Sequence, residues 1–66
     1  RSNPEAKARA DATVAQFRAS LEKIEKERDK AAAAGDTKKA ADAKARIATT
    51  RSLLEAAERA AEEFSG

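Results

Sequence analysis

Three carboxylates stand close together near the end of the chain, at Glu58, Glu62 and Glu63. Divalent cations such as Ca²⁺ and Mg²⁺ bind carboxylate oxygens, so a helix that carries these side chains could contribute ligands to a metal site. A pair of carboxylates that acts as acid and base also needs a pocket that raises the pKa of one of them. A short rod of helices does not provide such a pocket. We therefore interpret the three residues as a solvated acidic end, and we expect no metal and no cofactor.

Other catalytic groups are scarce. The chain contains no His and no Cys, which removes the usual general base, the usual transition-metal ligand and the thiolate nucleophile. The hydroxyl groups of Ser and Thr have no His to activate them. Gly35 and Gly66 are the only glycines and stand far apart, so no glycine-rich loop can cradle a phosphate. We expect that the chain is not an enzyme and takes no small-molecule substrate.

Five lysines are candidates for a nucleic-acid-binding surface: Lys23, Lys26, Lys30, Lys38 and Lys39. The first three are spaced by three and four residues and therefore share one face of a helix, and the other two follow close by. Such a face can contact the phosphate backbone of RNA or DNA. However, acidic residues alternate with these lysines, and the chain has no Tyr or Trp for base stacking. A helical arm that contacts tRNA or another RNA is the alternative function, and a solvated helix face is the preferred interpretation.

The hydrophobic pattern predicts the elements that position these residues. Apolar residues recur at alternating steps of three and four in two stretches, which is the heptad pattern of helices that pack side by side. Seven of the eight large apolar residues fall on these two stripes, and the exception is Leu53. The first stripe comprises Ala10, Val14, Phe17, Leu21, Ile24, Arg28 and Ala31, and the second comprises Ala40, Ala43, Ile47, Thr50, Leu54, Ala57, Ala61 and Phe64. The predicted fold class is all-α, an antiparallel two-helix hairpin with coiled-coil packing.

Residues typical of helix ends set the boundaries. Asn3 followed by Pro4 is typical of a helix N-terminus, because Asn caps free N–H groups and Pro fits the first helical position. Gly35 suits the left-handed conformation that ends many helices, and Asp36 can cap the next helix. So short a connection makes the helices antiparallel neighbours. The predicted boundaries are a helix at 4–34, a turn at 35–36 and a helix at 37–64.

The stripes also predict how the helices face each other. Ile24 is expected opposite Ile47, and Phe17 opposite Leu54. The charged residues expected to face each other beside the stripes are Glu25 and Lys44, Glu27 and Arg46, Arg18 and Arg51, and Asp11 and Glu58. The last two pairs are like-charged and of opposite sign. One hypothesis is a two-fold dimer in which the basic pair of one copy meets the acidic pair of the other.

Leu53 lies beside the second stripe, next to Ser20, with Ala60 one heptad further on and Thr13 opposite Ala60. These four residues are the candidate protein-interaction face. Small residues around one Leu can admit a helix of another protein or of a second copy. A globular helix also often buries a third position in each heptad, and Leu53 would then only widen the core. Both interpretations remain open.

Length and composition limit the remaining possibilities. The chain has 66 residues, of which 39% are charged, and its net charge of +2 predicts no partner by itself. Its longest uninterrupted apolar run covers residues 31–34, so we expect no membrane insertion. The sequence begins without Met, and we expect a single domain that is a fragment of a longer protein. Its few large apolar residues make a thin core, so we expect a protein partner, foremost a second copy in a homodimeric four-helix bundle. The expected function is a structural, oligomerisation or protein-docking element.

Overall fold

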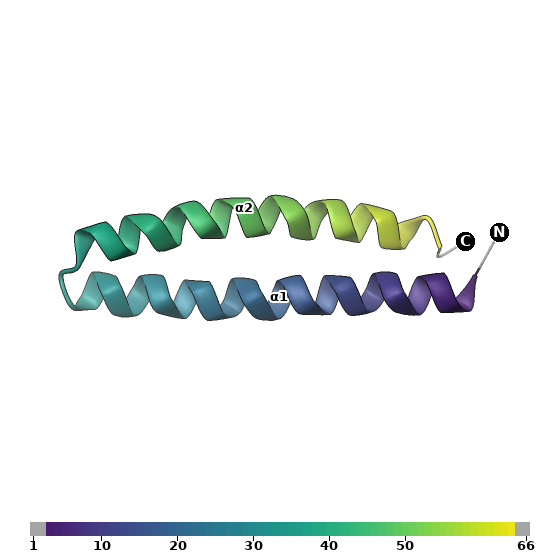
Figure 1. Cartoon of the computed structure of the whole chain (residues 1–66), viewed down its shortest axis with the longest axis horizontal. Helices are drawn as coiled ribbons and strands as arrows, with labels where there is room; N and C mark the ends of the chain where they lie inside the picture. Colours follow the sequence, from purple (N-terminus) through teal and green to yellow (C-terminus); the bar gives the residue numbers. More distant parts are fainter. Residues whose placement is uncertain (1–2, 65–66) are drawn as a thin grey trace.

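Two helices packed side by side make up the molecule (Figure 1). The computed structural model describes residues 3–64, in which α1 spans Pro4–Ala33 and α2 spans Thr37–Glu62. The helices run in opposite directions, and the molecule measures 51 × 14 × 11 Å. No strand occurs within residues 3–64. The predicted all-α antiparallel hairpin is confirmed.

The start of α1 has the predicted cap. The side-chain oxygen Oδ1 of Asn3 accepts a hydrogen bond from the N–H of Ala6 at 3.1 Å, and the carbonyl of Asn3 accepts one from the N–H of Lys7 at 2.9 Å. Pro4 occupies the first helical position, where its missing N–H leaves no hydrogen bond unmade. Local chemistry is therefore sufficient to begin α1 at this residue.

The connection between the helices is one residue longer than predicted, because α1 ends at Ala33 and not at residue 34. The N–H of Asp36 donates to the carbonyl of Ala31 at 2.9 Å, and the N–H of Gly35 donates to the carbonyl of Ala32 at 3.1 Å. This pair of bonds is the Schellman motif, which requires a left-handed residue after the helix cap. Gly35 is that residue, with φ of 75°.

Asp36 ends the turn and also begins α2. Its carboxylate Oδ1 accepts a hydrogen bond from the N–H of Lys39 at 3.0 Å, and its carbonyl accepts one from the N–H of Ala40 at 3.0 Å. One residue thus satisfies groups of both helices, which lets the chain reverse within residues 34–36. The tight reversal makes α2 pack directly against α1.

The end of α2 comes two residues earlier than predicted, at Glu62. The N–H groups of Glu63 and Phe64 donate to the carbonyls of Ala60 and Ala61 at 3.2 and 3.1 Å. These bonds span three residues instead of four, so the last turn is tightened, as is common at the C-termini of α-helices. Phe64 is nevertheless half-buried. Residues 65 and 66, which we predicted to follow the helix, lie outside the described residues.

The core follows the two predicted stripes, whose residues are all buried or half-buried. Ile24, Ala43 and Ile47 form its best-covered cluster, and Leu21 packs against them. The buried hydrophobic residues are Val14, Ile24, Ala31, Ala43, Ile47 and Ala61. Half of these are Ala, which allows the helices to approach closely. Within residues 3–64 no side chain is less than 2% exposed, so the core is thin.

Candidate protein-interaction face

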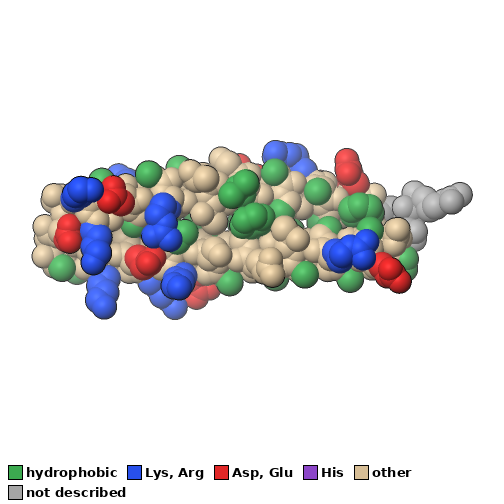
Figure 2. All heavy atoms as spheres, in the orientation of Figure 1, with side chains coloured by type: hydrophobic (Ala, Val, Ile, Leu, Met, Phe, Trp, Pro, Cys, Tyr) green, Lys and Arg blue, Asp and Glu red, His purple; other side chains and the backbone are tan. Residues whose placement is uncertain are grey.

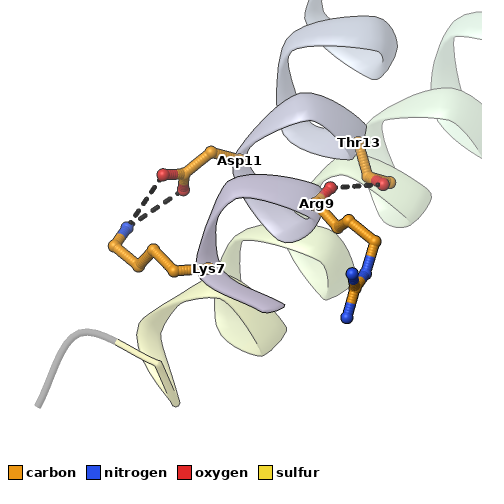
Figure 3. Close-up of polar contacts among 4 residues, drawn as sticks. All are labelled: Lys7, Arg9, Asp11 and Thr13. Carbon is orange, nitrogen blue, oxygen red and sulfur yellow. Dashed lines mark hydrogen bonds and ion pairs between the residues drawn. The ribbon is translucent and has the colours of Figure 1, made fainter. Parts of the chain in front are cut away.

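The hairpin has two long sides with different chemistry. The "paired side" carries ion pairs between the helices, and it comprises Lys7, Asp11, Arg18, Glu25, Arg51 and Glu58. The "neutral side" carries the predicted interaction residues Leu53, Ser20, Thr13 and Ala60, and its one ion pair between the helices within residues 3–64, Arg46–Glu27, lies towards the loop. Figure 3 shows the two flanks of α1, with Lys7 and Asp11 on one and Thr13 and Arg9 on the other. The difference follows from the heptad, which places the two sets on opposite flanks of the stripe.

Two ion pairs cross between the helices on the paired side. Arg18 Nη2 lies 2.9 Å from Glu58 Oε2, and Arg51 Nη2 lies 3.5 Å from Glu25 Oε2. Glu25, predicted to face Lys44, therefore pairs with Arg51 instead, and Arg18 and Arg51, predicted to face each other as like charges, each contact an acid of the other helix. An arginine side chain is long enough to reach diagonally past a like charge to an acid further along the other helix.

Asp11 also finds a cation, within its own helix. Lys7 Nζ lies 3.0 and 3.1 Å from the two carboxylate oxygens of Asp11 (Figure 3). The predicted like-charged pair of Asp11 and Glu58 is thus relieved as well, and the hypothesis of a dimer built on the like-charged pairs loses its basis. All these side chains remain at least one-third exposed. Exposed pairs of this kind each stabilise a fold by less than about 1 kcal/mol.

Leu53 is the one exposed large hydrophobic residue within residues 3–64, with 47% of its surface accessible. Ser20, Thr13 and Ala60 are exposed around it. The hairpin therefore covers only about half of Leu53 and leaves the rest in water. An apolar side chain in this state gains free energy if another molecule covers it.

Two hydroxyl groups on this side are hydrogen-bonded to the helix backbone. Thr13 Oγ1 donates to the carbonyl of Arg9 at 3.1 Å (Figure 3), and Thr49 Oγ1 donates to the carbonyl of Ala45 at 3.3 Å. A partner that covered these two hydroxyls would not leave an unsatisfied donor, so their burial carries a small penalty.

A shallow hollow of about 520 Å³ lies beside Ser20 on the neutral side. Phe17 and Ile24 supply its apolar lining, and Arg46 lies among the small residues that line it from α2. The lining residues are Phe17, Ser20, Lys23, Ile24, Glu27, Ala45, Arg46, Thr49 and Thr50. Sequence reasoning missed this hollow. Its signal is the run of small residues at Ser20, Thr49 and Thr50 beside larger core residues.

The loop end of the neutral side is charged. Arg46 Nη1 lies 3.6 Å from Glu27 Oε2, which confirms the predicted pairing of these residues. In the view of Figure 2, Lys, Arg, Asp and Glu side chains gather towards the loop end, and hydrophobic and uncharged groups occupy the middle. The uncharged part of this side is therefore bounded by charges.

The five lysines of the alternative nucleic-acid surface do not form one continuous basic stripe. Lys26 lies 3.4 Å from Glu22 and Lys38 lies 3.4 Å from Asp42, each pair within one helix. A second hollow, at the loop end, is lined by Glu27, Lys30, Ala31, Ala34, Asp36, Lys39, Asp42, Ala43 and Arg46. Lys30 and Lys39 thus line one hollow, together with the three carboxylates of Glu27, Asp36 and Asp42. Lys23 lines the hollow next to Ser20.

The acidic end does not assemble a metal site in the part of the chain that the structure describes. No group of three or more acidic side chains is placed to hold an ion within residues 3–64. Glu58 is engaged by Arg18 on the paired side, and Glu62 lines a hollow beside Lys7 and Arg18. Neither α1 nor α2 has a stretch that is long and apolar enough to span a membrane.

Comparisons with protein-family models, with curated proteins and with solved structures find no match to this chain.

Proposed function

We propose that this chain is a non-enzymatic coiled-coil hairpin that acts as a structural, oligomerisation or protein-docking element. The observation that supports it best is Leu53, which is 47% exposed among uncharged residues and beside a hollow with a partly apolar lining. Exposed apolar surface in such a setting favours a protein partner, because covering it releases water.

The alternative is a helical arm that contacts RNA through Lys23, Lys26, Lys30, Lys38 and Lys39. The position of Lys30 and Lys39 in the lining of one hollow at the loop end favours it. The acidic residues in the same hollow weaken it, because they repel phosphates as strongly as the lysines attract them.

A photoreactive benzoylphenylalanine at position 53 tests the proposal in the cells that make the protein. We expect a covalent adduct either to a different protein or to a second copy of this chain. The matched control carries the same group at Ala12, an exposed residue of α1 away from both stripes, and should give little or no adduct.

Two outcomes contradict the proposal. The first is the absence of a protein adduct at position 53, or adducts of equal yield at positions 53 and 12. The second is binding of mixed tRNA by the chain at low salt that weakens steeply as salt rises, together with loss of that binding in Lys30→Glu. That result would establish the RNA-contacting arm instead.

A further inference from the structure

Leu53 and the hollow beside Ser20 form a projection and a recess on the same side of the hairpin. At about 1.5 Å per residue, Leu53 lies roughly 24 Å along α2 from Thr37, and the centre of the hollow lies roughly 8 Å nearer the loop. The midpoint between them lies about 20 Å from the loop end, close to the middle of a molecule 51 Å long.

We propose that the neutral side binds a second copy of this chain, in an antiparallel two-fold dimer in which Leu53 of each copy enters the hollow beside Ser20 of the other. This inference rests on the proposed function and names its partner. A two-fold interface uses the same patch twice, so it requires a projection and a matching recess on one surface. With the axis about 20 Å from the loop end, the two antiparallel rods overlap along about 40 Å of their 51 Å length.

The available area fits a weak, reversible dimer. An overlap of about 40 Å along a face 14 Å wide corresponds to roughly 560 Å² per copy, compared with about 800 Å² per partner in a typical stable interface. The two-fold axis lays α2 of one copy over α1 of the other, so four helices enclose one core. Leu53, half-exposed in the hairpin, becomes a central residue of that core.

The distribution of charge favours the antiparallel orientation. Residues 20–53, which form the loop half, carry nine basic and six acidic side chains, a net charge of +3. The remaining residues carry five basic and six acidic side chains, a net charge of −1, and the two halves add to the total of +2. An antiparallel dimer places the positive half of each copy over the negative half of the other, whereas a parallel dimer stacks the two positive halves.

Individual residues fit this orientation. By helical rise, the Glu27–Arg46 pair of one copy lies within about one turn of the small side chains of Thr13 and Ala60 of the other. The same two-fold rotation brings Lys30 of one copy to within about one helical turn of Glu63 of the other, and both residues are exposed. It also moves Lys39 towards Arg9, a like-charged approach that lowers the affinity.

Analytical ultracentrifugation of the 66-residue chain tests the dimer. We expect the mass to rise from 7.0 kDa towards twice that value between about 10 µM and about 1 mM protein. Leu53→Glu should weaken the dimer by about 30-fold or more, because each half-buried Leu contributes roughly a five- to sixfold factor and the dimer contains two. Ala12→Glu adds the same charge away from both stripes and should leave the mass curve unchanged.

A second variant separates loss of the interface from loss of the fold. Ser20→Arg fills the mouth of the hollow and removes no core residue, because Ser20 is exposed. Its helix content by circular dichroism should equal that of the unmodified chain, while its dimer is lost.

A charge exchange supplies a third measurement. Lys30→Glu and Glu63→Lys should each weaken the dimer severalfold, and the double variant should restore it.

The orientation is measured with one spin label. The chain has no Cys, so Ala33→Cys near the loop is the only labelled position, and the antiparallel dimer separates the two labels by about 40 Å. A separation below about 20 Å would show a parallel dimer and overturn the inference. A chain that remains monomeric to about 1 mM, or a dimer that survives both Leu53→Glu and Ser20→Arg, would overturn it too. In either case an adduct from position 53 to another protein would leave the proposed function standing.

Discussion

Gly35 is the residue on which the reversal of the chain depends, and its replacement tests the hairpin directly. Its φ of 75° lies in the left-handed region, and no atom outside its neighbours lies within 4 Å of the position that a Cβ would occupy. The effect of a side chain here is therefore conformational and not steric. We expect Gly35→Ala to lower the free energy of unfolding by about 1–2 kcal/mol, the penalty of the left-handed conformation for an L-residue.

The mirror-image residue gives a matched control, since a chain of this length can be made by chemical synthesis. D-Ala at position 35 prefers positive φ and meets the same open space, so it should stabilise the hairpin by about 0.4–1 kcal/mol by restricting the unfolded chain. Asn at this position should fall between Gly and Ala, because Asn tolerates the left-handed region better than Ala does.

Urea unfolding followed by circular dichroism measures these differences, at one fixed protein concentration so that self-association does not contribute. With a slope near 1 kcal/mol per molar urea for a small protein, Gly35→Ala should lower the midpoint by about 1–2 M, and D-Ala should raise it. Equal midpoints for L-Ala and D-Ala would refute the reasoning. They would show that residue 35 does not hold a left-handed turn, and that the two helices are not joined as described.

Three further changes test the rest of the hairpin. Asp36→Ala removes the carboxylate that accepts the N–H of Lys39 and should destabilise the fold by about 1 kcal/mol in thermal or urea unfolding, whereas Asp36→Asn should retain most of the stability. Ile47→Ala, at a residue only 4% exposed, should cost about 2–3 kcal/mol, the lower part of the usual range because the core is thin; a loss below about 0.5 kcal/mol would contradict the observed packing. A double-mutant cycle on Arg18 and Glu58 should give a coupling below about 1 kcal/mol that disappears in high salt, and a salt-insensitive coupling would contradict the exposed geometry of this pair.

Much of the fold could be predicted from the sequence, because its determinants are local or periodic. The alternation of three and four residues places Ile24 and Ile47 on facing stripes, and both are buried. Asn3 and Asp36 accept the N–H groups expected of helix caps, and Gly35 adopts the left-handed conformation. Leu53 was predicted to lie beside the core stripe, and it is about half exposed.

The ends of the helices were less predictable. The bonds from Gly35 and Asp36 to the last turn of α1 leave Ala34 outside the helix, although Ala has the highest helix propensity. At the other end, Glu63 and Phe64 form a tightened turn that the stripe alone does not distinguish from helix. Hydrogen bonds at a terminus depend on backbone geometry after the last repeat, which periodicity does not record.

The sequence by itself determined that two helices form, that they run antiparallel and which residues face the core, because heptad spacing and capping act over a few residues. Only the tertiary structure decided that Glu25 pairs with Arg51 and that Arg18 pairs with Glu58, since the partner of a long charged side chain depends on which opposite charge it can reach on the other helix. It also decided that a hollow opens beside Ser20, next to the exposed Leu53. A recess of this kind depends on the volumes of side chains from both helices at one level, and that level is set when the helices pack.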